Sequence, residues 1–357
     1  MADDNKDKLN EQLFRCILDD KLSTDKKLKK MEYILRLGAD VNALHEFGFS
    51  ALSVAKMTKN ESVIQFLENN GGEEKFLLDK DRANSFFNKT SVEDMNNFLK
   101  LLPDGYVLDF DIHINMDKMK ELPDLSRFFV KGDFICAFNK LTSLKGAPRE
   151  VSGIFNCSCN ELETLEGAPS KVGIAFDCFG NKLKTLKGGP KKVGWNFSCN
   201  NNNLVNLVGA PKLGEFEFDW LDVPLYLPED MDIGFYCCSN ELKSLEGAPE
   251  YVRGNFRCSY NKLENLIGAP RVITNRFECK NNELTTIEGA YDVVCEIFDY
   301  SKNKITSFDK KPKNARGIIN DEKNFIDRLF QRAEKSKRVE KVMNNKIVSK
   351  ILERIFD

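Results

Sequence analysis

Three carboxylates alternate along one short stretch of the chain. In "EFEFDW" the acids Glu215, Glu217 and Asp219 are two residues apart, and Trp220 follows directly. On a strand, side chains two residues apart point to one face and lie about 6.6 to 7 Å from each other, which suits an acid/base pair. This spacing does not by itself build a cage for a hard metal ion. The pattern therefore leaves open a scaffold irregularity, a partner-binding surface or an active site.

The thiols and imidazoles offer little further chemistry. The two histidines, His45 and His113, are far apart in the sequence and fall in different predicted modules, which argues against a Cys–His nucleophile pair. The cysteines lack the Cys-x2-Cys spacing of zinc sites. Seven of them share one position in a repeat: Cys136, Cys157, Cys178, Cys199, Cys237, Cys258 and Cys279. The sequence predicts buried, reduced thiols, and no metal ion or cofactor.

A repeat of constant length positions these cysteines. Phenylalanines recur at every twenty-first position in two blocks: Phe134, Phe155, Phe176 and Phe197, then Phe235, Phe256, Phe277 and Phe298. Each unit reads as in "VSGIFNCSCNELETLEGAP". Phe and Cys, two apart on a short strand, should both point into a core, and the two leucines should return the chain over it. Each unit cannot bury its own core, so the sequence predicts a stacked solenoid.

An asparagine recurs at one position of every unit. The set is Asn139, Asn160, Asn181, Asn202, Asn240, Asn261, Asn282 and Asn303. A buried amide must be hydrogen-bonded, so we expect these side chains to form an internal ladder that bonds the backbone of its own bend and of the next turn. The glycine of the closing "GAP" should relax the turn that follows.

The repeat breaks between Phe197 and Phe235, which are four positions closer together than two full steps would place them. The simplest interpretation places a shortened turn of the solenoid at Phe216. In that register Glu215, Glu217 and Asp219 point outward on the concave face. The sequence thus predicts an acidic and aromatic surface there, with Tyr236 on the next turn.

These units resemble a known family. "DGYVLDFDIHINMDKMKELPDL", followed by units such as "GNFRCSYNKLENLIGAP", is similar to the leucine-rich-repeat proteins encoded by large bacteriophages and some giant viruses. The resemblance covers about residues 104–308. It implies a solenoid with a parallel β-sheet on its concave face and a role in binding, and it transfers no catalytic residue.

A different pattern lies upstream. "ILRLGADVNALHEFGFSALSVAKMTKNESVIQFLENNGG" resembles the ankyrin repeat, with Gly38–Asn42 as its turn and 63–67 in its second helix. Positions 8–20 and 26–37 would supply the preceding helix pair. We therefore expect an α+β repeat protein in four parts: an ankyrin-like helical module (1–75), a connecting helix and N-terminal cap (76–129), about nine short leucine-rich-repeat turns (130–308) and a C-terminal helical cap or tail (309–357).

The outward strand positions of the solenoid have no uniform charge. A small basic cluster, Arg257, Arg276 and Lys280, stands out among them. The chain has a net charge of −2 and no apolar run long enough to span a bilayer, so the sequence does not indicate a membrane partner. The basic residues of 309–357 are not interleaved with aromatic residues as stacking on bases would need, so the sequence does not indicate nucleic acid either. A cytoplasmic location, in the host cell if the protein is viral, is the default expectation.

These observations favour a non-enzymatic protein that binds another protein through the concave face, as a viral factor that blocks or redirects a host protein would. Two alternatives stay open. One is an enzyme or small-ligand binder that uses Glu215, Glu217 and Asp219. The other is an assembly scaffold that self-associates through an amphipathic helix at 338–356.

Overall fold

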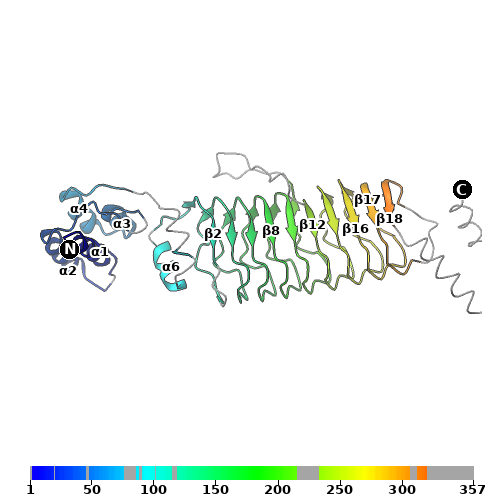
Figure 1. Cartoon of the computed structure of the whole chain (residues 1–357), viewed down its shortest axis with the longest axis horizontal. Helices are drawn as coiled ribbons and strands as arrows, with labels where there is room; N and C mark the ends of the chain where they lie inside the picture. The colour runs from blue at the N-terminus through cyan, green and yellow to red at the C-terminus, as the bar shows by residue number, and fades with distance from the viewer. Residues whose placement is uncertain are drawn as a thin grey trace, which may run out of the picture. The chain divides into compact units, whose positions relative to one another are not determined.

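We describe the chain from a computed structural model. It describes residues 2–19, 21–45, 48–75, 86–87, 91–100, 102–114, 119–214, 233–305 and 312–319. The chain divides into two compact units, one of residues 1–156 with 167–171 and one of residues 157–166 with 172–357. Each unit is described by itself. Figure 1 shows helices in the first part of the chain and a succession of short strands after them.

The first unit begins with helices. Their bounds are α1 Ala2–Leu18, α2 Thr24–Arg36, α3 Ala51–Met57, α4 Glu61–Asn69 and α6 Val92–Leu99. Leu13, Met31 and Leu67 lie fully buried among α1, α2 and α4. Ser50 caps α3 by accepting a hydrogen bond from the backbone N–H of Ser53, and such a cap stabilises a helix start. These helices overlap the stretches predicted to be helical, while the ankyrin assignment stays a prediction.

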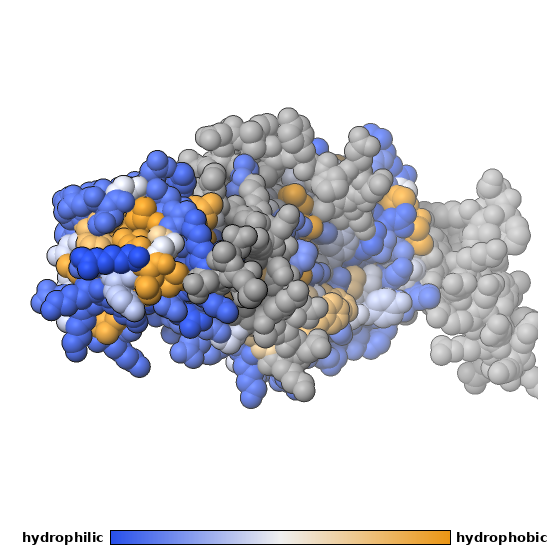
Figure 2. Space-filling view, turned by 60° about the vertical axis from the view of Figure 1, so that its left-hand side comes forward, coloured by the Kyte–Doolittle hydropathy of each residue, from blue (hydrophilic) through white to orange (hydrophobic). Residues whose placement is uncertain are grey.

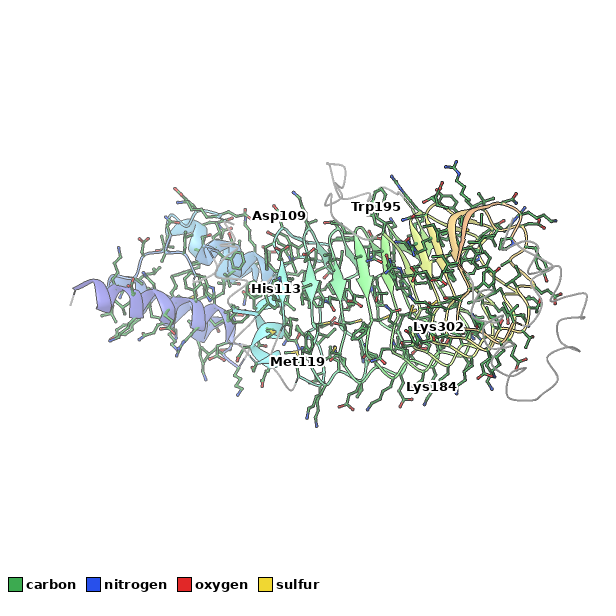
Figure 3. The ribbon with its side chains drawn as sticks, turned by 45° about the vertical axis from the view of Figure 1, so that its right-hand side comes forward. Asp109, His113, Met119, Lys184, Trp195 and Lys302 are labelled. Atoms are coloured by element: carbon green, nitrogen blue, oxygen red, sulfur yellow. The ribbon has the colours of Figure 1, made fainter. Side chains whose placement is uncertain are left out.

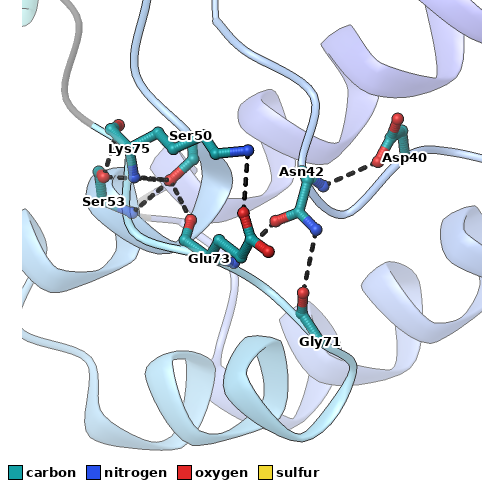
Figure 4. A network of polar contacts seen from close by, with 7 residues as sticks. All are labelled: Asp40, Asn42, Ser50, Ser53, Gly71, Glu73 and Lys75. Carbon is teal, nitrogen blue, oxygen red and sulfur yellow. Dashed lines mark hydrogen bonds and ion pairs between the residues drawn. The ribbon is translucent and has the colours of Figure 1, made fainter.

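A side-chain network fixes the loops beside α3. Asn42 donates to the carbonyl of Gly71 (3.0 Å) and accepts from the backbone N–H of Glu73 (2.7 Å), and Ser50 and Ser53 donate to the carbonyls of Glu73 and Lys75 (Figure 4). Asn42 and the two serines thus tie the segment after α4 to the turn before α3.

The rest of the described chain is a parallel β-solenoid, and we call one turn of it a rung. Its strands are β1 Val107–Leu108, β2 Ile112–His113, β3 Phe129–Val130, β4 Phe134–Ile135, β5 Glu150–Val151, β6 Phe155–Asn156, β7 Lys171–Val172, β8 Ala175–Asp177, β9 Lys192–Val193, β10 Asn196–Ser198, β11 Lys212–Leu213, β12 Gly234–Tyr236, β13 Tyr251–Val252, β14 Asn255–Arg257, β15 Val272–Ile273, β16 Arg276–Glu278, β17 Cys295–Asp299 and β18 Ala315–Ile319.

Among the described residues these strands form sheets of ten, six and two strands. We call the ten-stranded one the long sheet. Within the first unit the strands follow the orders β2-β4-β6 and β1-β3-β5. Within the second unit the long sheet runs β8-β10-β12-β14-β16-β17-β18, beside β9-β11 and β13-β15. β18 lies within 309–357, for which the sequence suggested only helices. Positions 309–311 and 320–357 of that prediction are outside the described part.

The predicted core is confirmed. The repeat phenylalanines and the seven repeat cysteines have no exposed surface. Phenylalanines of neighbouring rungs pair in register. The rings of Phe277 and Phe298 stack with their centroids 4.5 Å apart, whereas those of Phe256 and Phe277 meet edge to face. The alternation of the strand therefore places Phe and Cys inside and their neighbours outside, as the sequence predicts.

The predicted rung at Phe216 is wrong. β10 pairs directly with β12, and Phe197 lies opposite Phe235. Lys212 of β11 lies opposite Lys192 of β9, yet the chain from Lys212 to Phe235 is far longer than the five steps from Lys192 to Phe197. Positions 215–232 are thus an insertion between β11 and β12, and they lie outside the described residues. The interval from Phe197 to Phe235 can hold either two short rungs or one rung with an insertion. Only the pairing of the strands distinguishes these two arrangements.

Deleting residues 215–232 is expected to preserve the solenoid. The deletion leaves Lys212 five residues before Phe235, as in the preceding rung, so the urea midpoint should stay the same or rise, with a change in unfolding free energy within about 1 kcal/mol. Deletion of residues 258–275 is the matched control, because it removes the same length but shifts later strands three residues out of step. Loss of cooperative unfolding in the first variant would contradict the assignment of an insertion.

Candidate functional site

Four of the eight predicted site residues are described. Glu215, Glu217, Asp219 and Trp220 lie in the insertion, outside the described residues. Tyr236, Arg257, Arg276 and Lys280 lie on the second unit, and the structure brings the first three together.

Three adjacent strands of the long sheet position this site. Tyr236 of β12 lies opposite Arg257 of β14, which lies opposite Glu278 of β16. Each of the three follows a buried phenylalanine, so the pleat turns its side chain to the outer face of the sheet. Arg276 is two residues before Glu278 and Lys280 is two after it, and all three therefore share the outer side. We call Tyr236, Arg257, Arg276, Glu278 and Lys280 the arginine cluster.

Glu278 connects the two arginines. Its Oε2 is 3.8 Å from Nε of Arg257 and its Oε1 is 3.4 Å from Nε of Arg276. Arg257 also lies over the ring of Tyr236, with its Cζ 5.3 Å from the centroid. A cation over an aromatic face is attracted by the ring quadrupole, so Tyr236 holds the Arg257 guanidinium in place. The sequence indicated the basic residues but not the role of Glu278. The signals for it were its place between Arg276 and Lys280 and its position one repeat step after Arg257.

The arginine side chains of the cluster are partly exposed to solvent, while the residues that hold them are largely buried. Both arginine side chains are 34% exposed, whereas the side chain of Glu278 is 13% exposed. Tyr236 is buried, with 7% of its surface exposed. The guanidinium groups can therefore meet a ligand, while the groups that orient them stay covered.

Tyr260 is an exposed aromatic residue next to this cluster that sequence reasoning missed. Its side chain is 55% exposed, and its backbone N–H donates to the carbonyl of Lys280 at 3.0 Å. It has a positive φ of 59°, as does every residue directly before a ladder asparagine: Phe138, Cys159, Gly180, Asn201, Ser239, Tyr260, Asn281 and Lys302. This conformation is unfavourable for a bulky side chain, so the bend of each rung imposes it.

Replacing Tyr260 with glycine is expected to stabilise the solenoid by about 0.5–1 kcal/mol, because relief of the left-handed strain exceeds the extra entropy that glycine loses on folding. Urea denaturation measures the change. Gly180 has the same conformation with a φ of 66°, so Gly180→Ala is the reverse control and should destabilise. A loss of stability in Tyr260→Gly would show that the tyrosine ring makes a stabilising contact.

The buried thiols are poor nucleophiles. Burial raises the pKa of Cys178, Cys199, Cys237, Cys258 and Cys279 well above the usual value of a thiol, and it raises the pKa of Cys295 to about 11. A thiol with a raised pKa carries little thiolate at neutral pH. Among the described residues, no group of three metal-ligating side chains gathers at one place.

Alkylation with iodoacetamide at pH 8 is expected to modify Cys159 first. Cys159 and Cys238 are half-buried, but burial raises the pKa of Cys238, and Cys157 on the rung of Cys159 is fully buried. The thiols of the core should react only after denaturant is added. Peptide mass spectrometry over time measures the order. Native labelling of Cys178 or Cys258 as fast as Cys159 would contradict the burial of this core.

The histidines take no part in the arginine cluster. His45 lies in a turn, where its backbone N–H donates to the carbonyl of Phe49, and its ring packs edge-on against Phe14 at 5.1 Å. His113 is exposed on β2 (Figure 3).

Apolar side chains are also exposed in the helical part of the first unit. Figure 2 shows orange patches among blue residues on the side that carries these helices. Tyr33, Leu37 and Leu44 are 64%, 51% and 47% exposed. Single exposed apolar side chains are common on protein surfaces and do not by themselves indicate a ligand, so we do not assign them to the site.

Within the described part of the chain, no helix has the length and apolar character needed to cross a bilayer. Sequence comparison assigns no relative: no protein-family profile matches the chain, and no curated protein is significantly similar to it.

Proposed function

We propose that this chain is a non-enzymatic protein-binding module and that its partner contacts the outer face of the long sheet at β12, β14 and β16. The arginine cluster is the observation that carries the proposal. Arginine and tyrosine are enriched among the residues that dominate binding energy, above all where they are held in a fixed conformation. Arg257 is held by Tyr236 on one side and Glu278 on the other.

The scaffold supports this role. Strands of neighbouring rungs keep one register, so the outward side chains of a repeat protein form a preorganised surface, and preorganisation reduces the entropy lost on binding. In the buried core, by contrast, the thiols have raised pKa values, which argues against nucleophilic catalysis there.

The resemblance to leucine-rich-repeat and ankyrin proteins extends the proposal. The resemblance supports a viral protein that binds a host protein in the cytoplasm of the host cell. The insertion belongs to the same proposal, because no rung needs residues 215–232 to complete its pairing with the next. Glu215, Glu217, Asp219 and Trp220 are then a second contact region for the partner.

Affinity capture from cell extract with three forms of the chain tests the proposal. Ser198 lies opposite Tyr236 and points outward, so Ser198→Trp places a bulky neutral group on the proposed face. Lys184→Trp is the control, because Lys184 is exposed on a turn away from the long sheet (Figure 3). Proteins recovered by the wild type and the control but lost with Ser198→Trp support the face; equal recovery by all three forms would refute it.

A further inference from the structure

We infer that a groove beside the two-stranded sheet binds an extended, uncharged segment of a second protein in which prolines are three residues apart. The groove has a volume of about 540 Å³. The apolar part of its lining includes Tyr251, Ala269, Pro270, Val272, Tyr291 and Val294. β13 and β15 are not strands of the long sheet, so this groove is a different site from the arginine cluster.

The groove lies where the repeat changes in three ways. The first residues of β13 and β15 are Tyr251 and Val272, whereas β9 and β11 begin with lysines. Tyr291 takes the place of the proline that closes the turns before it. Val294 lies opposite Val272, although one full step of the repeat leads from Val272 to Val293. These changes coincide at one place and make an outward row of the solenoid apolar.

The side chains of this row are open to a ligand. Tyr251 and Val294 are 49% and 47% exposed, and Val272 between them is partly exposed. The residue that follows each of them is buried, so the alternation of the strands turns the row outward. The hydroxyls of Tyr291 and Thr286 are hydrogen-bonded at 3.0 Å, which holds the ring of Tyr291 in the lining of the groove.

The charges at the rim favour an uncharged ligand. Nη1 of Arg271 lies 3.2 Å from Oε1 of Glu250, and Nζ of Lys313 lies 3.1 Å from Oδ1 of Asp292. Each charge of these four residues is therefore matched within the chain. A charged segment would meet a like charge beside every opposite one, whereas apolar rings lose little on leaving water for an apolar groove.

The spacing of the rungs selects the conformation of the segment. Tyr251 pairs with Val272 and Val272 with Val294, so the outer two lie two rungs apart, roughly 9.6 Å at about 4.8 Å a rung. A polyproline II segment has three residues per turn and rises about 3.1 Å per residue, so residues i and i+3 share one side about 9.3 Å apart. Prolines three residues apart therefore reach Tyr251 and Val294 together.

The mode of contact also fits this conformation. Val272 is already paired on both sides, so a segment that crosses it contacts side chains and adds no strand there. Polyproline II needs no partner strand, and it is recognised in aromatic-lined grooves by the packing of its rings. Tyr251 and Tyr291 supply the aromatic lining.

Fluorescence anisotropy on the full chain tests the inference. The probe is a labelled nine-residue peptide with proline at every third position and alanine elsewhere, and the control peptide has the same composition with its three prolines adjacent. The wild type should bind the probe at least about tenfold more tightly than the control peptide. Added salt should change this affinity less than about twofold, because the segment carries no charge.

Two variants of the groove should weaken binding of the probe. Tyr251→Ala should weaken it at least about tenfold, and so should Val272→Lys, which gives β15 the residue type that β9 and β11 carry at this position. Tyr260→Ala is the matched control, because Tyr260 is exposed to a similar extent, 55%, and does not line the groove; it should change affinity less than about twofold. Urea denaturation of each variant verifies that the fold is kept.

The inference is overturned if the wild type does not bind the probe saturably, if it binds the control peptide equally well, or if Tyr251→Ala and Tyr260→Ala weaken binding equally. Tighter binding of a peptide that alternates glutamate or lysine with serine would show a charged ligand and would overturn it too. Ser198→Trp lies on the long sheet and should leave the affinity for the probe unchanged. Capture with that variant tests the proposed function alone, so the two proposals can fail separately.

Discussion

Replacing Asn261 with leucine is expected to lower the free energy of unfolding by about 4 kcal/mol, because two buried N–H groups lose their acceptor at about 1–3 kcal/mol each. Oδ1 of Asn261 accepts from the backbone N–H of Asn240 and of Leu242, both at 3.1 Å. Its Nδ2 donates to the carbonyls of Cys237, Cys258 and Ser259. The residue therefore joins two rungs, and leucine satisfies none of these groups.

Asn265 offers the control on the same rung. Its Oδ1 accepts a single hydrogen bond, from the N–H of Ile267 on the exposed side, so Asn265→Leu should cost less than about 1 kcal/mol. Urea denaturation measures the global effect, and hydrogen exchange at the amides of Asn240 and Leu242 measures the local one. Equal losses in the two variants would show that the asparagine ladder does not hold the rungs together.

Replacing Gly289 with alanine is expected to destabilise the solenoid by about 3 kcal/mol, from about 1–2 kcal/mol of backbone strain and a similar cost of overpacking. Gly289 has a φ of 95°, and a Cβ there would lie 2.3 Å from the carbonyl carbon and oxygen of Leu266 on the neighbouring rung. Backbone atoms cannot move aside as a flexible side chain can, so the two rungs must separate.

Gly38 separates the two contributions. It has a φ of 106°, but a Cβ at this position meets no atom within 4 Å, so Gly38→Ala should show the strain alone, about 1 kcal/mol. Hydrogen exchange near each site measures both changes. If Gly289→Ala costs no more than Gly38→Ala, the close approach of the rungs at the "GAP" turn is not a constraint on the sequence.

The sequence alone determined the repeating part of this protein. Phe256, Cys258 and Asn261 recur one constant step later as Phe277, Cys279 and Asn282. Residues at the same position of the repeat have equivalent neighbours, so the recurrence of one residue type predicts the same environment in each rung. Burial of the Phe and Cys rows and the hydrogen bonds of the asparagines follow from that repetition.

The left-handed bends show where the sequence signal fails. Phe138, Tyr260 and Lys302 are not residue types that favour a positive φ, yet each adopts one. The bend is imposed by the asparagine that follows, whose side chain bonds the carbonyls around it, as Asn261 does with Cys258 and Ser259. These hydrogen bonds override the conformational preference of the preceding residue, and a further bond from Asn261 to the carbonyl of Cys237 fixes the amide against the neighbouring rung. β18 was missed for a different reason: it is a strand because it pairs with β17.

Only the tertiary structure decided how the repeat is interrupted between Phe197 and Phe235 and which side chains of the arginine cluster are in contact. Counting residues cannot distinguish a shortened rung at Phe216 from an insertion, whereas the direct pairing of Phe197 with Phe235 can. The sequence likewise placed Arg257 and Arg276 on one face, because alternation on a strand fixes the side to which a residue points. The constant step already implies that Glu278 lies opposite Arg257. Only the structure shows that its carboxylate reaches both arginines, because the order of residues does not specify distances between side chains.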